Sequence, residues 1–146
     1  MNRALQARGL VTWFDEERME GRIMATMSAA VENTRCVIVF ITDAYRNKVN
    51  GEDEKDNCQY EFSYAARLDS LGPQKMIPVV MEPGMRASTS WRGILAGNLH
   101  NKLYVDLSDV NWEAPGAAFE TKMKELSDQV YRIIGKVLSI IIFKEI

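Results

Sequence analysis

The chain has 146 residues, the size of a single domain. Its 18 basic and 20 acidic residues give a net charge of −2, so no basic excess marks a nucleic-acid surface. One histidine and two cysteines are too few for a zinc site or a disulfide framework, and no apolar run approaches the ~20 residues that cross a bilayer. We therefore expect a cytoplasmic protein without a metal, a nucleic-acid partner or a membrane span.

Helix-like and strand-like segments alternate along the sequence, which predicts a parallel α/β sheet covered by helices. A short helix over residues 2–8 is expected to end at Gly9, and a strand rich in β-branched and aromatic residues follows at 10–14. After a polar loop over 15–21, the spacing of the apolar residues predicts a helix over 21–33.

Two continuous apolar runs predict strands that are buried on both faces. The first covers residues 36–41 and is followed by an expected loop over 43–57 and a helix over 57–70. The second covers 76–81 and contains Pro78, which donates no ladder hydrogen bond. This proline favours a position near the sheet edge or at a bulge.

The last third of the chain predicts a short strand, a long helix and a final strand-like segment. The strand is expected at 103–107, and the helix begins near Pro115, a residue suited to the first helical turn. Apolar residues repeat along this helix as they do on a face packed against a sheet, at Phe119, Met123, Leu126, Val130, Ile133 and Val137. The apolar segment 139–143 follows.

Three pieces of sequence occur in an order that resembles a known family. Residues 14–15 precede a polar loop in which Gly21 opens a helix, and residues 42–45 place a small hydroxyl residue and then a tyrosine after a buried strand. Residues 58–61 read Cys-Gln-Tyr-Glu, similar to a Cys-x-x-Glu core in the third helix of that family. The family that these pieces resemble is the TIR (Toll/interleukin-1 receptor) domain.

The resemblance implies a flavodoxin-like, doubly wound parallel sheet over residues 1–138, with the family's first, central strand absent. The missing strand would lie between the strands at 10–14 and 36–41, where unpaired backbone groups are costly. We therefore expect a domain truncated at its N-terminus and an apolar tail of uncertain structure over 139–146, since such tails are more often frayed or paired at an edge. The alternative is that 139–143 inserts in the empty place.

The resemblance also implies function, because TIR domains include adaptors of innate immunity as well as enzymes that cleave NAD. The adaptor function is cytoplasmic signal transduction through homotypic self-association, with other TIR domains as partners. The family's main self-association surface corresponds to the polar loop over 15–21. Met19, Glu20 and Gly21 are therefore the expected contact residues.

Glu61 is the candidate catalytic residue if the chain is an NAD glycohydrolase. Nicotinamide leaves NAD as a neutral pyridine that needs no proton, so one carboxylate can stabilise the oxocarbenium-like transition state. The resemblance implies this role for Glu61, with NAD as the substrate and no cofactor. Because α/β sheets bind ligands at strand ends, the candidate substrate-binding residues are Asp15, Arg18, Thr42 and Tyr45.

Glu61 also has a purely structural interpretation. A carboxylate in the first turns of a helix favours the helix dipole by about 0.3–1 kcal/mol, and such a group is usually exposed. TIR domains that act as scaffolds carry this glutamate too, and Asn57 stands where NAD-cleaving relatives have a tryptophan. Whether the chain is an enzyme is left open, and a nucleoside ribosyltransferase or a phospho-receiver domain that uses Asp43 are further alternatives.

Three other residues of chemical interest have simple structural interpretations. Cys58 is expected to be a small buried hydrophobe, and Trp91 a hydrophobic plug beneath a loop. His100 stands near a predicted helix end and is interpreted as a surface residue.

Overall fold

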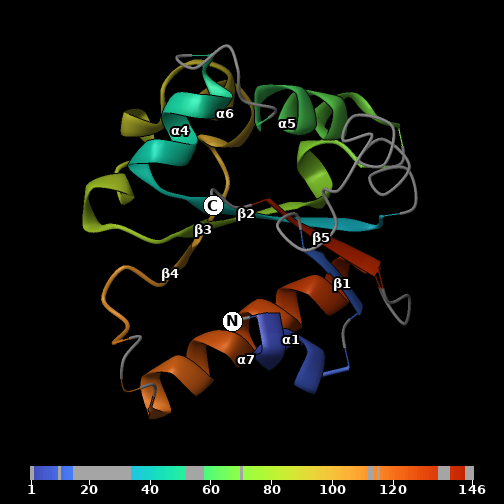
Figure 1. The fold of residues 1–146 in the computed structure, drawn as a ribbon, viewed down its shortest axis with the longest axis vertical. Helices are drawn as coiled ribbons and strands as arrows, with labels where there is room; N and C mark the ends of the chain where they lie inside the picture. Colours follow the sequence, from blue (N-terminus) through green and yellow to red (C-terminus); the bar gives the residue numbers. More distant parts are fainter. Residues whose placement is uncertain are drawn as a thin grey trace.

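A parallel sheet lies between two layers of helices in the computed structural model of the chain (Figure 1). The structure describes residues 2–9, 11–14, 34–51, 58–69, 71–111, 114, 116–134 and 139–143, with only the backbone described for 2, 11–14 and 139–143. The loop expected at 15–21 and the helix expected at 21–33 lie outside these residues.

The sheet has five strands, and every pair of neighbours is parallel. In spatial order the strands are β1 (Val11–Phe14), β5 (Ser139–Phe143), β2 (Cys36–Ile41), β3 (Met76–Val80) and β4 (Val105–Asp106). This arrangement, with helices on both faces, confirms the predicted flavodoxin-like α/β class.

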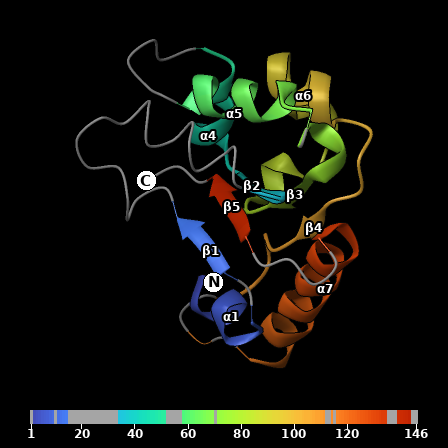
Figure 2. The ribbon, with the colours of Figure 1, turned by 90° about the vertical axis from the view of Figure 1, so that its right-hand side faces the viewer.

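The C-terminal segment 139–143 forms the central strand of the sheet. Ile140 in β5 is in register with Thr12 of β1 on one side and with Cys36 of β2 on the other. Figure 2 shows the β5 arrow between β1 and β2. This is the place that the resemblance assigns to the family's first strand, so the structure shows the alternative placement and not a frayed or edge-paired tail.

β2 and β3 form the buried half of the sheet, as their apolar sequences predict. All residues of both strands are buried, and their register runs from Val37 opposite Met76 to Ile41 opposite Val80. Pro78 immediately precedes the two residues of β3 that pair with the edge strand β4. Its missing donor therefore leaves the β3–β4 ladder intact, in agreement with a position near the sheet edge.

Helices cover both faces of the sheet (Figure 1). One face carries α1 (Asn2–Ala7) and α7 (Ala117–Ile134), and the other carries α4 (Asp43–Val49), α5 (Cys58–Arg67) and α6 (Gly93–Leu99). Short 3-10 turns precede β3 and α6, at Pro73–Lys75, Pro83–Met85 and Ser88–Trp91. No helix among the described residues is long and apolar enough to cross a membrane.

The prediction of a loop from residue 43 onward is wrong, because α4 occupies the first part of the range 43–57. The helix forms here because Thr42 has extended backbone angles and its Oγ1 accepts a hydrogen bond from the Tyr45 amide at 3.0 Å. This is an N-cap contact, which satisfies one of the free amides at a helix start. Asp43 in the first turn adds a favourable charge for the helix dipole.

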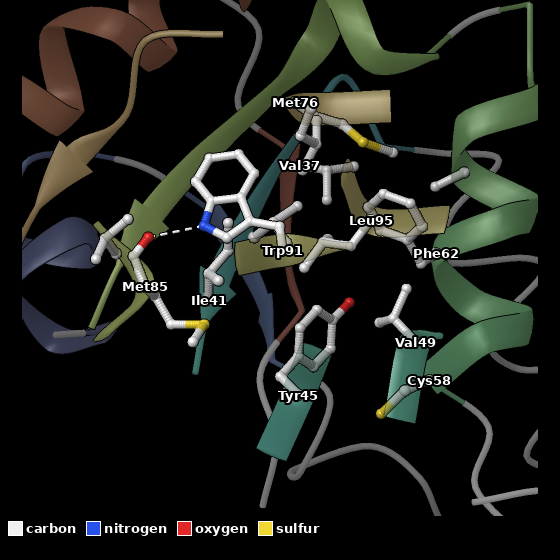
Figure 3. Packing of buried hydrophobic residues seen from close by; sticks show 14 of the residues in the cluster. Val37, Ile41, Tyr45, Val49, Cys58, Phe62, Met76, Met85, Trp91 and Leu95 are labelled. Carbon is white, nitrogen blue, oxygen red and sulfur yellow. Dashed lines mark hydrogen bonds between the residues drawn. The ribbon is translucent and has the colours of Figure 1, made fainter. Parts of the chain in front are cut away.

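Each face of the sheet has its own apolar core. The lower core, between the sheet and α1 with α7, contains the predicted α7 stripe through Val130 and also Ile134, and the predicted Ile133 is partly buried against it. The predicted Val137 lies outside the described residues. The upper core, between the sheet and α4 to α6, is built around Trp91 (Figure 3). Its other largest fully buried members are Tyr45, Phe62, Ile41, Met76, Leu95 and Leu99.

Candidate functional site

The carboxyl ends of β2 and β3 meet at the start of α4. Thr42 follows β2 and caps the helix, while Glu82 lies just beyond β3 and accepts a hydrogen bond from the Asp43 amide through Oε2 at 3.1 Å. Two side-chain oxygens from neighbouring strand ends therefore satisfy the first turn of one helix. The Thr42 hydroxyl oxygen already accepts from the Tyr45 amide, which gives this predicted substrate-binding residue a structural contact.

Arg46 is a largely buried cation one turn further along α4. Its guanidinium donates to Asp43 Oδ1 at 2.5 Å, to Asn47 Oδ1 at 3.0 Å and to the Ser90 carbonyl at 3.0 Å. Charge-assisted bonds of this kind are about twice as strong as neutral ones. Arg46 thereby ties α4 to the 3-10 turn that carries Trp91, and the Asp43 carboxylate of the phospho-receiver alternative is engaged in an ion pair.

Asn50, at the end of α4, holds the start of α6. Its Nδ2 donates to the Trp91 carbonyl at 3.0 Å, and its Oδ1 accepts from the Leu95 amide at 3.1 Å. Gly93 has a φ of 49°, and a Cβ at this position would lie 2.8 Å from the Asn50 side chain. Glycine is therefore required by both the backbone conformation and the close approach of Asn50.

The end of β4 carries a second polar group. Asp106 Oδ1 accepts from the Ser108 amide at 2.9 Å and from its hydroxyl at 2.5 Å, and Oδ2 lies 3.1 Å from Arg86 Nε. Burial alone would raise the pKa of Asp106, but the bonds from Ser108 and the charges of Arg86 and Lys122 outweigh it, so the pKa is lowered. The carboxylate is therefore held in its charged form.

Glu61 lies on the buried face of α5, with only 2% of its surface exposed. It shares this face with Cys58, Phe62 and Ala65, which are also buried. The expectation of a solvated acid at the helix start is therefore wrong. The reason is geometric, since positions 58, 61, 62 and 65 follow the i, i+3, i+4, i+7 spacing of one helix face.

Tyr45 is fully buried in the upper core. Figure 3 shows its ring among Val49, Cys58 and Leu95. Its position gives the ring a packing role in the described structure and no open surface on which to stack a substrate. Cys58 is buried as predicted, as is Trp91, whose Nε1 donates to the Met85 carbonyl at 2.7 Å (Figure 3).

The remaining predicted site residues lie outside the described residues. They are the substrate-binding candidates Asp15 and Arg18 and the self-association candidates Met19, Glu20 and Gly21. Their segment starts where β1 ends, at Phe14, and the described chain resumes at Thr34, two residues before β2. The structure thus fixes the two ends of this segment.

Among the described residues, no group of acidic, histidine or cysteine side chains has the arrangement of a metal site. Hollows on the described surface include one along the outer side of α7 and one of about 360 Å³ between residues 109–111 and the start of α7. Neither hollow is lined by Thr42, Tyr45 or Glu61.

Comparison with known proteins identifies the family to which the chain belongs. The family model of the TIR domain matches residues 1–127, most of the chain. The chain belongs to the TIR domain family. No curated protein and no solved structure matches the sequence.

TIR domains are modules of signal transduction that work through TIR-mediated interactions, and they serve innate immunity in general. In this TIR domain the matched residues contain β1 to β4, the site at the strand ends and the undescribed segment 15–33. The match ends inside α7, so β5 lies beyond it.

Sequence reasoning missed three polar residues at the strand ends of this TIR domain, Glu82, Arg46 and Arg86. A signal for Glu82 was present, because it follows a buried strand just as Thr42 does. The bond of Arg46 to Ser90 and the bonds of Arg86 to Ser108 and Asp106 gave no comparable signal, since they join segments 20 to 44 residues apart. Such pairings depend on the tertiary fold.

Proposed function

We propose that this TIR domain acts in cytoplasmic signal transduction by homotypic TIR–TIR self-association, with the segment carrying Met19, Glu20 and Gly21 as the contact surface. The single observation that carries the proposal is the TIR match, which includes this whole segment. Its ends are joined to β1 and β2, two strands of the same parallel sheet, so both ends of the segment are anchored in the fold.

The polar groups at the strand ends support a scaffold. Arg46 and Asp106 have their charges engaged by neighbouring side chains, and Thr42 and Glu82 are used to start α4. Each of these groups serves the fold. They tie α4 to the strand ends and to the 3-10 turn before α6, and a preorganised fold lowers the entropy lost when two copies associate.

A charge reversal in the proposed contact segment tests the proposal. We expect the wild-type chain to gain mass with concentration in analytical ultracentrifugation, and Glu20→Lys to shift this association to at least tenfold higher concentration. Glu125→Lys is the matched control, because it makes the same charge reversal at an exposed glutamate of α7, outside the proposed contact segment. Equal association of wild type and Glu20→Lys would contradict the proposed surface.

NAD cleavage by Glu61 is the second candidate function, and the burial of Glu61 favours it. Glutamate is almost never this buried unless it is paired, so burial sets Glu61 apart from an ordinary solvated acid. A carboxylate in a medium of low dielectric constant interacts strongly with a developing positive charge, as on a ribosyl oxocarbenium ion. We propose Glu61 as the group that would stabilise this ion, with NAD as the substrate.

Nicotinamide release from NAD tests this second function. Glu61→Gln keeps the size of the side chain and removes its charge, so we expect release to vanish while the circular dichroism spectrum is kept. Glu125→Gln on exposed α7 is the control and should retain the wild-type rate. A wild-type chain that self-associates and releases no nicotinamide would exclude this function and leave the scaffold.

A further inference from the structure

β5 is bonded on both sides, and both neighbours come from distant parts of the chain. Its ladder with β1 runs from Val11–Ser139 to Phe14–Ile142, and its ladder with β2 from Cys36–Ile140 to Val39–Phe143. Without β5, the facing edges of β1 and β2 would present two rows of free amides and carbonyls at the sheet centre. β5 is therefore the element that joins β1 to the rest of the sheet.

The connection to α7 indicates that β5 belongs to the same copy. α7 ends at Ile134, which is packed in the lower core, and β5 begins at Ser139. The residues between them reach at most about 18 Å when fully extended. Because this connection is short and starts from a packed helix, it favours insertion of β5 into the sheet that α7 itself covers.

The two strands that β5 joins are also the two ends of the proposed contact segment. The chain leaves β1 after Phe14 and enters β2 at Cys36, and Met19, Glu20 and Gly21 lie between these points. With β5 in place, Phe14 is in register with Ile142 and Cys36 with Ile140, so β5 lies between the two ends.

We propose that β5 is a latch, which joins β1 to the rest of the sheet within one copy, and that self-association of this TIR domain depends on this closure. The consequence for self-association rests on the proposed function, whereas the closure itself does not. β2, β3 and β4 do not need the latch, because they pair directly with one another. β2 and β3 share the upper core with Trp91, and Val105 of β4 lies in the lower core. The latch therefore acts on β1.

One substitution tests the closure in the full chain. Ile140 is in register with the natural Cys36, and registered residues of neighbouring strands share a face about 4.7–4.9 Å apart, within the range for a disulfide. We expect Ile140→Cys to form an intrachain disulfide with Cys36 when an oxidant is added. Cys36→Ser combined with Ile140→Cys is the control and should form none, since Cys58 lies in the upper core.

A second pair of variants tests the effect on self-association. Ile141→Pro removes a ladder donor from β5, whereas Ile141→Val keeps the donor and the β-branched side chain. We expect Ile141→Pro to raise hydrogen exchange in β1 while β2 and β3 stay protected, and to weaken self-association at least tenfold. Ile141→Val should behave like the wild type.

The outcomes separate the latch from the proposed function. An interchain disulfide, or none at all in oxidised Ile140→Cys, would overturn the latch, as would wild-type exchange of β1 in Ile141→Pro. Loss of self-association in the oxidised Ile140→Cys variant would also overturn it, and this locked variant decides the question if Ile141→Pro does not fold. A wild-type chain that never self-associates refutes the proposed function, while the disulfide and the exchange of β1 still judge the closure.

Discussion

Two parts of the sheet are built in different ways. β2, β3 and β4 are successive in the chain and pair with one another, and β2 and β3 cover a common core with α4, α5 and α6. β1 and β5 come from opposite ends of the chain and pair with each other, so that Thr12 meets Ile140. The first part is assembled from near neighbours in sequence, and the second part closes the longest loop in the domain.

This difference has consequences for stability and folding. Pairing of distant segments must overcome a larger loss of chain entropy than pairing of near neighbours, and it is slower. We therefore expect β2 to β4 to be the stable part, and the β1–β5 side to open first in local unfolding. The proposed contact segment starts on the side that opens first.

Truncation of Trp91 is expected to have the largest effect of the variants in the stable part. The side chain is fully buried, and its removal leaves a large cavity in the upper core. Trp91→Ala should lower the free energy of unfolding in urea by about 3–5 kcal/mol. Trp91→Phe, which fills part of the cavity, should cost less, and an unfolding energy unchanged in Trp91→Ala would refute the central position of this core.

Loss of Asn50 should have the next largest effect, because two bonds between α4 and the start of α6 disappear together. Asn50→Ala leaves the Trp91 carbonyl and the Leu95 amide without these partners, at a cost of about 1–3 kcal/mol in a urea titration. Asn101→Ala, at an exposed position, is the control and should be neutral. If both variants cost the same, the Asn50 bonds do not support the stable part.

Removal of the α4 cap should have a smaller effect. Thr42→Ala loses the hydroxyl that accepts from the Tyr45 amide, which should cost about 1 kcal/mol, while Thr42→Ser keeps the acceptor. Thermal unfolding followed by circular dichroism measures the difference. Because Thr42 lies in the stable part, Thr42→Ala should lower the temperature of global unfolding. The amides of β1 should still exchange before those of β2 to β4, as in the wild type.

Asp106 should give the smallest effect, one that depends on pH. The carboxyl pKa is lowered in the folded chain by Ser108, Arg86 and Lys122, so its contribution is present above the unfolded pKa of about 3.9 and disappears as pH falls through the folded pKa. Asp106→Asn should therefore be less stable than wild type at neutral pH, and the gap should narrow in acid. A gap that widens as pH falls would contradict this assignment of charges.

The elements that sequence reasoning predicted well depend on local patterns. The apolar run of β2 matched the observed strand residue for residue, because a strand buried on both faces needs apolar residues throughout. The strand predicted at 103–107 is shorter in the structure, Val105–Asp106, because only these two residues pair with β3. Leu103 is 92% exposed. Sequence reasoning did not predict α4, although Thr42 followed by Asp43 is a typical helix start.

The features that sequence reasoning could not settle depend on tertiary placement. The segment 139–143 is strand-like in sequence, but its position between β1 and β2 follows from which backbone edges are left unpaired in the folded sheet. The burial of Glu61 was within reach, because Cys58, Phe62 and Ala65 define an apolar stripe that includes position 61. The residue type of Glu61 alone indicates an exposed position, whereas its apolar neighbours on the same helix face indicate burial.

The most direct test of the account is hydrogen–deuterium exchange of the wild-type chain at low and at high concentration, resolved by segment. We predict that self-association slows exchange in peptides that cover residues 15–21, and leaves the exposed outer side of α7 unchanged. Slowing confined to other segments, or no difference between the two concentrations, would contradict the claim that this TIR domain works by homotypic contact through Met19, Glu20 and Gly21.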